Sequence, residues 1–225
     1  MSASASLVCY FRSSQGDAVL RSRSVSDLVL AGTLDVPMLP VRLVTDCERE
    51  IAFRLALEPG DVEDLSLARA RMRWPGSGRW EQAASDWMSA QGLHDVLTTS
   101  DLALMACRGA RYHHDGAQYG FAAFCNLFLS EDKGLDLHFP LTGCRIPLAR
   151  GMMVVFDTAQ PHAVIPRGCS SFNVSHFAPD QDCTQLFLSW ELAIEHAAVT
   201  QALGIDFDID PVTASALQDE QVWVA

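Results

Sequence analysis

The sequence predicts a mainly β protein with flanking helices, whose centre is an antiparallel sandwich or barrel. Residues 103–178 consist of short strand-like runs separated by turns rich in Gly, Pro and acidic residues. Short strands at this spacing, with no helical segment between them, are typical of antiparallel sandwiches and barrels rather than of a parallel α/β sheet. A length of 225 residues is enough for one domain with a sizeable core. We therefore expect a single domain over residues 1–225.

Residues 1–102 are predicted to form a β/α region that supports the barrel. Runs rich in β-branched and aromatic residues indicate strands, and they stand at residues 7–11, 18–22, 41–45 and 51–57. Two helices are expected next, over residues 62–72 and 79–92. The first has acidic residues in its first turn and arginines in its last, which suits the helix dipole, and the second ends on Gly92.

The barrel core is predicted to span residues 103–178 and to be followed by a C-terminal helix and tail over 179–225. Its expected strands are at residues 104–114, 120–130, 134–140, 144–148, 151–157, 162–166 and 171–177. Residues 188–204 carry apolar side chains at helical spacing and stop at a glycine, a common residue after a helix end. This segment is expected to be a helix packed on the outside of the barrel.

The charge balance excludes several classes of partner. The chain has 28 acidic and 16 basic residues, a net charge of −12, and Lys133 is the only lysine. Nucleic-acid binding needs a basic surface, so we expect no nucleic-acid partner. No apolar run approaches the roughly 20 residues that cross a bilayer, which predicts no membrane partner. The N-terminus has neither a basic region nor a long apolar run, and this predicts a cytoplasmic protein.

Seven cysteines are spread along the chain without a CxxC pair. An odd number at irregular spacing fits neither a disulfide framework nor a zinc ribbon. We expect free thiols, most of them buried.

A His-x-Asp pair and a distant histidine predict a metal site. His113 and Asp115 stand in the segment RYHHD, and His162 stands in FDTAQPHAVIP. In an extended strand alternate residues share a face, so His113 and Asp115 are expected to point together and His114 away. Two imidazoles and one carboxylate on one side of a metal, with the other positions open, form the facial triad of non-haem Fe(II) oxygenases.

Residues 104–178 resemble the double-stranded β-helix core, a jelly-roll or cupin-like barrel, of the Fe(II)/2-oxoglutarate-dependent oxygenases. RYHHD looks like that superfamily's His-x-Asp motif, and GMMVVFDTAQPHAVIP is similar to the segment that carries its distal histidine. The resemblance implies iron(II) held by His113, Asp115 and His162, with 2-oxoglutarate and O2 at the open positions.

Members of this superfamily usually bind the far carboxylate of 2-oxoglutarate with an arginine about ten residues after the distal histidine, but Phe172 stands at that place here. Arg167, five residues after His162, is the first candidate for this role, and Lys133 and Arg145 are the alternatives. A buried dicarboxylate needs a paired cation, so one of these three is expected to point inward. Asn126 is a further candidate contact of the co-substrate.

The predicted function is a dioxygenase that hydroxylates or oxidises a small molecule, an amino acid or a peptide. Two alternatives remain open. The first is a cupin-type metalloenzyme that uses no 2-oxoglutarate, although cupins usually bind metal through three histidines and a glutamate, and that pattern is not found here. The second is a catalytically silent jelly-roll binding module.

Overall fold

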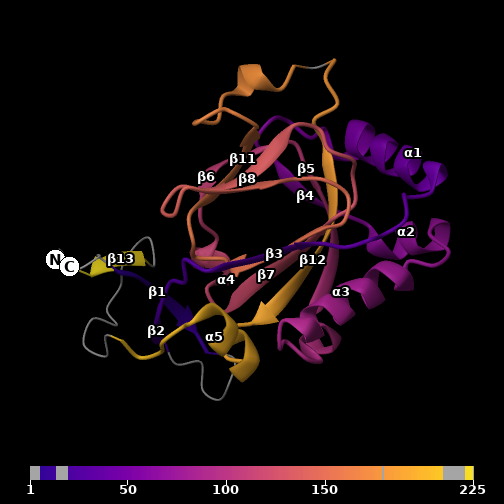
Figure 1. Cartoon of the computed structure of the whole chain (residues 1–225). Helices are drawn as coiled ribbons and strands as arrows, with labels where there is room; N and C mark the ends of the chain where they lie inside the picture. Colours follow the sequence, from indigo (N-terminus) through magenta and orange to yellow (C-terminus); the bar gives the residue numbers. More distant parts are fainter. Residues whose placement is uncertain (1–5, 14–19, 179, 210–220, 225) are drawn as a thin grey trace.

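The computed structural model describes residues 6–13, 20–178, 180–209 and 221–224, and two antiparallel sheets form its centre (Figure 1). One sheet has six strands in the order β3-β10-β7-β12-β5-β4, and the other has four in the order β6-β11-β8-β9. The strands are β3 (Val29–Thr33), β4 (Val62–Leu65), β5 (Asp101–Cys107), β6 (Ala110–His113), β7 (Ala122–Phe128), β8 (Leu135–Phe139), β9 (Cys144–Pro147), β10 (Met152–Asp157), β11 (His162–Pro166) and β12 (Gln185–Ala193).

The eight strands from β5 to β12 have the topology of a double-stranded β-helix. The chain passes from one sheet to the other at every connection except the β8–β9 hairpin, so β5, β7, β10 and β12 share one sheet while β6, β8, β9 and β11 share the other. Gly109 makes the first of these crossings, between β5 and β6. Its φ of +74° suits glycine, and a Cβ there would lie 2.4 Å from the Phe177 ring. The predicted jelly-roll fold class is confirmed.

Period-2 alternation along the six-stranded sheet separates two apolar cores. Along β12, Leu188, Trp190 and Leu192 face the helices, and Phe187 faces the four-stranded sheet. The core between the sheets is rich in phenylalanine, with Phe128 and Phe187 stacked at 5.2 Å between ring centroids. This inner core surrounds the space where a site can form.

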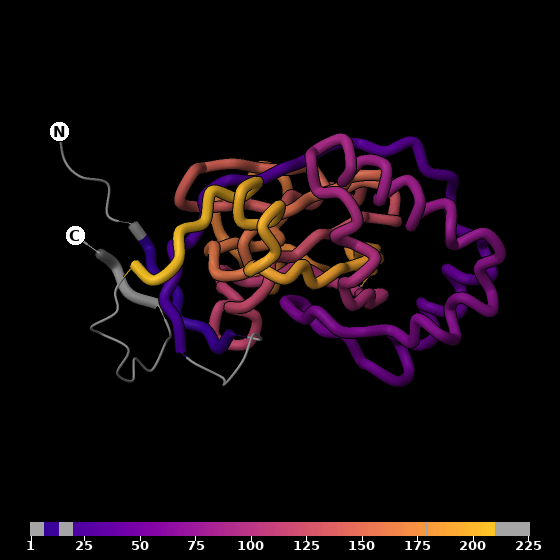
Figure 2. Tube along the Cα trace, turned by 90° about the horizontal axis from the view of Figure 1, so that it is seen from below, coloured from indigo at the N-terminus to yellow at the C-terminus, as the bar shows by residue number. Residues whose placement is uncertain are grey.

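Helices cover the outer face of the six-stranded sheet. They are α1 (Val41–Glu50), α2 (Leu67–Arg73), α3 (Gly78–Ala90) and α5 (Ala197–Leu203), and a one-turn helix, α4 (Gly116–Tyr119), follows β6. Figures 1 and 2 show α1, α2 and α3 on the side of the barrel opposite a small sheet. That sheet contains β1 (Ser6–Arg12), β2 (Leu20–Ser24) and β13 (Gln221–Val224). Within the described ranges, every helix is too short or too polar to pass through a bilayer.

Several N-terminal predictions are wrong. Residues 41–45 belong to helix α1, not a strand, because Leu43 and Cys47 stand four residues apart and bury one helical face. Residues 51–55 continue as a π-helical turn. The helix expected over 62–72 is instead strand β4 followed by α2. The helix expected over 79–92 is confirmed as α3, and the strand expected at 7–11 as β1.

The last strand of the barrel lies later in the chain than expected. Residues 171–177 contain only a 3₁₀ turn, at Val174–His176, and the strand that completes the barrel is β12 at Gln185–Ala193. The segment 188–204 was expected to be one helix, but it contains most of β12 and then α5. The other strands expected in the core are present as β5 to β11, the first expected run, 104–114, being split into β5 and β6 by Gly109. Part of the C-terminal tail, residues 210–220, lies outside the described residues.

Candidate metal centre and cavity

The two histidines of the predicted triad face each other across a strand pair. His113 ends β6, His162 begins β11, and they are direct partners in the antiparallel register. Their ring centroids are 4.5 Å apart. Antiparallel pairing therefore brings together two imidazoles that are 49 residues apart in the sequence.

Asp115 completes the group from the turn after β6. Its two carboxylate oxygens face different histidines, with Oδ1 3.6 Å from Nε2 of His113 and Oδ2 3.6 Å from Nε2 of His162. One ligand atom from each of the three residues lies within 4.8 Å of the other two. The side chains converge as predicted, but the cause is different: β6 ends at His113, so Asp115 is placed by the turn and not by strand alternation.

Backbone contacts set the orientation of both rings. Nδ1 of His113 lies 2.6 Å from the Arg111 carbonyl oxygen, and Nδ1 of His162 lies 2.9 Å from the Gln160 carbonyl oxygen. Each carbonyl can only accept, so each Nδ1 carries the proton and each Nε2 presents a lone pair toward Asp115. This is the tautomer that metal-binding histidines adopt. His114 takes no part, because its Nδ1 accepts from the backbone N–H of Gly116.

Burial controls the protonation of the group. His162 is 6% exposed, and its burial, together with the nearby His113, lowers the pKa of its imidazole to about 3. Burial also raises the pKa of Asp115, and the neighbouring His113 and His114 partly oppose this increase. At neutral pH His162 is therefore a neutral base that does not have to lose a proton before it binds a cation.

A buried ion pair holds both ligand-bearing segments in place. Arg23 on β2 donates two hydrogen bonds to Asp157, at 2.6 and 2.8 Å, and a third to the Gly120 carbonyl oxygen, at 2.8 Å. Asp157 ends the strand before His162, and Gly120 follows the helical turn after Asp115. Thr158 links the same segments, because its carbonyl oxygen accepts from the backbone N–H of Asp115 at 2.8 Å.

The three candidate ligands line a cavity of about 630 Å³ between the two sheets. Much of its wall is aromatic, from Phe124, Phe128, Phe156 and Phe187. The polar lining includes Asn126, which the sequence predicted as a contact, and Tyr119, Ser189, Asp64 and Glu191, which it did not. The described residues that line the cavity include no lysine and no arginine.

The three candidate cations lie away from this cavity. Arg167 binds Asp132 and Asp136, and Arg145 also binds Asp136. Leu137 lines the cavity, so by alternation its neighbour Asp136 faces the other side of the sheet and holds both arginines there. Lys133 pairs with Asp182 in the segment between β11 and β12. The expectation that one of these three points inward is therefore not met.

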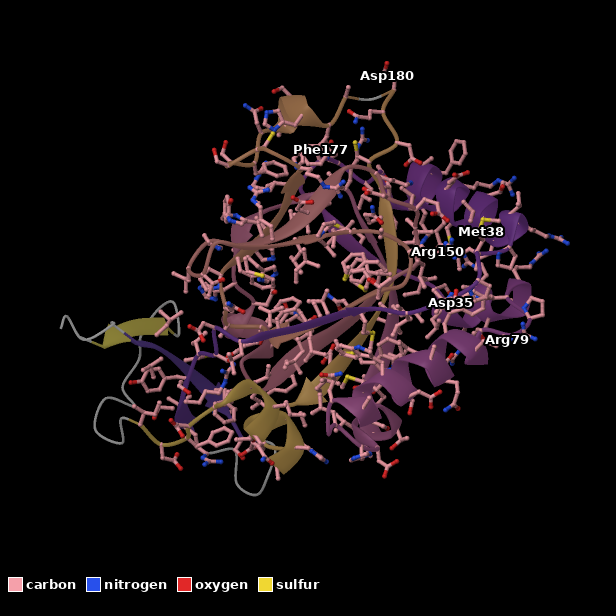
Figure 3. The ribbon with its side chains drawn as sticks, viewed as in Figure 1. Asp35, Met38, Arg79, Arg150, Phe177 and Asp180 are labelled. Atoms are coloured by element: carbon pink, nitrogen blue, oxygen red, sulfur yellow. The ribbon has the colours of Figure 1, made fainter. Side chains whose placement is uncertain are left out.

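The segment between β11 and β12 covers one end of the barrel. Figure 3 shows Phe177 close to the barrel and Asp180 farther out in this segment. Phe177 is 2% exposed and stacks on Phe172 at 5.2 Å between ring centroids. Phe172 stands ten residues after His162, where oxygenases of the resembled superfamily usually have their arginine. It packs in the segment between β11 and β12, before the last strand begins.

No family model matches the chain, and no curated protein matches it. Solved structures similar to it include a prolyl-4-hydroxylase from Pseudomonas putida, with 18% identity over 73% of this chain and 92% of that one, at a TM-score of 0.39. A viral collagen prolyl hydroxylase from Paramecium bursaria Chlorella virus-1, with 11% identity over 72% and 94%, gives 0.42. A non-haem α-ketoglutarate-dependent epimerase of nogalamycin biosynthesis, with 13% identity over 73% and 78%, gives 0.40.

These likenesses are too distant to assign an activity to the chain. In the chain itself, two imidazoles and one carboxylate converge at an aromatic cavity inside a double-stranded β-helix.

Proposed function

We propose that this protein is a mononuclear non-haem iron(II) oxygenase. The observation that supports this most directly is the convergence of His113, Asp115 and His162, with one ligand atom from each within 4.8 Å of the others, at the wall of the cavity between the sheets. Two imidazoles and a carboxylate that leave the opposite coordination positions open are the facial triad of iron oxygenases.

The residues fit a ferrous ion. Both Nε2 atoms present lone pairs because both Nδ1 atoms donate to backbone carbonyls. The cluster contains no thiolate, unlike most structural zinc sites. Its three protein ligands leave coordination positions for O2 and a substrate or co-substrate.

Each side chain near the centre has a distinct part in the proposed chemistry. His113 and His162 would donate nitrogen lone pairs, and Asp115 would supply the negative charge that offsets part of the metal's charge. The rings of Phe124 and Phe156 line the adjoining cavity and would pack against the carbon skeleton of a substrate. A ferrous ion bound there supplies the activation of O2 for the oxidation of a C–H bond in a small-molecule or peptide substrate.

The cavity does not fit 2-oxoglutarate in the predicted manner. 2-Oxoglutarate carries two carboxylates, and the far one needs a cation if it is buried. In the described part of the chain, the lining supplies only neutral donors for it, such as the Asn126 amide and the Tyr119 hydroxyl. Binding of 2-oxoglutarate thus remains a prediction from the sequence resemblance, and the absence of a cation favours a second candidate, an iron oxygenase that does not use it.

One anaerobic experiment tests the proposal and separates the two candidates. Fe(II) is titrated into the metal-free protein, and 2-oxoglutarate is then added while the visible spectrum is recorded. A weak charge-transfer band, followed by succinate formation in air, would support the 2-oxoglutarate enzyme. One bound Fe(II) without such a band would support the second candidate. Failure of the wild-type protein to bind Fe(II) would refute the proposed function in both forms.

A further inference from the structure

The carboxylates of the cavity are concentrated on one side. Asp64 on β4 and Glu191 on β12 line it, and β5 runs between these two strands. We call these two residues the acidic wall; the neighbouring Glu63 points to the helix side by strand alternation, as Leu65 does. In the described residues, neither Asp64 nor Glu191 takes part in an ion pair. With Asp115 they make three carboxylates around a cavity without a lysine or arginine in its described lining.

The environment of Glu191 is unfavourable for a negative charge. Burial raises the pKa of its carboxyl group, and Asp101, its direct partner across the β5–β12 pair, raises it further. Burial raises the pKa of the nearby Tyr119 phenol, and the negative charges of Glu191, Asp115 and Asp64 raise it further. A bound cation would relieve the repulsion among these acidic groups.

A separate observation points to a ligand at this place. Asn126 is 7% exposed and lines the cavity, and its Oδ1 is buried without a hydrogen-bond partner among the described residues. Buried polar atoms in native proteins are nearly always hydrogen-bonded. An acceptor that faces a cavity without a partner is therefore placed to receive a hydrogen bond from a bound molecule.

The strand register puts Asn126 within reach of Glu191. Asn126 on β7 is the direct partner of Ser189 on β12, and Glu191 lies two residues farther along the same face. Diagonal neighbours on one face of a sheet are about 7–8 Å apart. One ammonium or guanidinium group between them can donate to the amide oxygen and to the carboxylate at the same time.

We propose that the cavity binds a cationic substrate, a molecule with a protonated amine or a guanidinium group on an apolar carbon skeleton. Its charged group is held by Glu191 and Asn126 in the field of the acidic wall, and its carbon skeleton lies against the phenylalanines beside the metal centre. Aromatic faces also attract cations. This inference deepens the proposed function and rests on it for the chemistry that follows binding.

The test compares three six-carbon probes whose terminal groups are positive, neutral and negative. Binding of n-hexylammonium, n-hexanol and hexanoate to the full chain is measured calorimetrically at pH 7, with Zn(II) bound as a redox-inert ion and again after chelation. We expect n-hexylammonium to bind most tightly in both states. Hexanol or hexanoate binding equally well to the chelated protein would overturn the proposal, and this comparison requires no variant.

Variants locate the bound charge. Glu191→Gln is expected to weaken n-hexylammonium binding by about ten- to a hundredfold, the range of a hydrogen bond to a charged group, and to leave hexanol binding unchanged. Glu48→Gln removes one exposed carboxylate on α1 and is expected to change neither. An unchanged preference for the ammonium in the double variant Glu191→Gln/Asp64→Asn would overturn the assignment to the acidic wall.

Two further arms separate the source of the cation and the basis of any failure. A short peptide with one lysine, compared with its norleucine counterpart, distinguishes a peptide side chain from a free amine, and a preference for lysine supports the same site. Fe(II) binding is measured on the same protein. If the protein binds no Fe(II) but still prefers the ammonium probe, the oxygenase assignment alone is refuted. Fe(II) binding without that preference would refute the cationic-substrate inference alone.

Discussion

The buried pair of Arg23 and Asp157 offers a sharp test of how the metal centre is positioned. Both side chains are fully buried. Asp157 accepts two hydrogen bonds from Arg23, at 2.6 and 2.8 Å, and one each from the backbone N–H groups of Ser26 and Ala159, at 2.8 and 2.9 Å. Asp157→Ala leaves a guanidinium and two backbone donors buried without their acceptor.

Removing one partner of a buried ion pair typically costs about 3–5 kcal/mol, and we expect Asp157→Ala to fall in or above this range. The free energy of unfolding is measured by urea denaturation with a constant m-value. Asp157→Asn keeps the shape and one carbonyl acceptor, so it is expected to cost less. Arg71→Ala breaks the exposed pair with Glu81 and serves as the control, with an expected cost of at most about 1 kcal/mol.

Substitution of Asp157 should also affect the metal centre, because Arg23 connects the segment after Asp115 to the strand before His162. Asp157→Asn is therefore expected to lower Fe(II) affinity although it removes no ligand. A cost for Asp157→Ala no larger than that of the Arg71→Ala control, with the Fe(II) affinity of Asp157→Asn unchanged, would show that the pair does not position the metal centre.

Three further predictions concern other parts of the molecule. Arg167→Ala should leave 2-oxoglutarate affinity unchanged, because its guanidinium is held by two aspartates outside the cavity; a rise in KM of about tenfold or more would restore it as the co-substrate cation. Cys144 and Cys169, the two cysteines that are not fully buried, should react first with a thiol reagent in the native protein, and reductant should not shift Tm. Gly168→Ala, with φ of +85° and open space at Cβ, should cost about 1–2 kcal/mol. Gly109→Ala should lower the free energy of unfolding by about 1–3 kcal/mol more than Gly168→Ala does, because its Cβ would overlap the Phe177 ring. Equal losses for the two variants in urea denaturation would contradict this.

The triad could be predicted because its signals are local and topological. The spacing of His113 and Asp115, and the run of short strands that contains His162, are visible in the sequence alone. The fold brings the three side chains together through the β6–β11 pairing. The exact placement of Asp115 could not be predicted, because the sequence pattern does not show that the strand ends at His113 and a turn follows.

The negative charge of the cavity could not be predicted, because the sequence predicts helices over residues 62–72 and 188–204, where the structure has the strands that carry Asp64 and Glu191. In residues 185–193, Leu186, Leu188, Trp190 and Leu192 alternate with residues that face the cavity, which is a period-2 signal. The apolar residues that follow also match helical spacing, so the pattern over residues 188–204 predicts a helix. With a helix at this place, the closing strand is expected at residues 171–177, and Glu191 is not expected to face the cavity.

An anaerobic Fe(II) titration of the wild-type protein and of the variants His162→Ala and His114→Ala tests whether His113, Asp115 and His162 hold one metal ion together. We expect one Fe(II) per chain, an affinity loss in His162→Ala larger than the roughly 10- to 100-fold typical of losing an outer-sphere partner, and near wild-type binding in His114→Ala. Wild-type affinity in His162→Ala, or a greater loss in His114→Ala, would contradict the proposed centre.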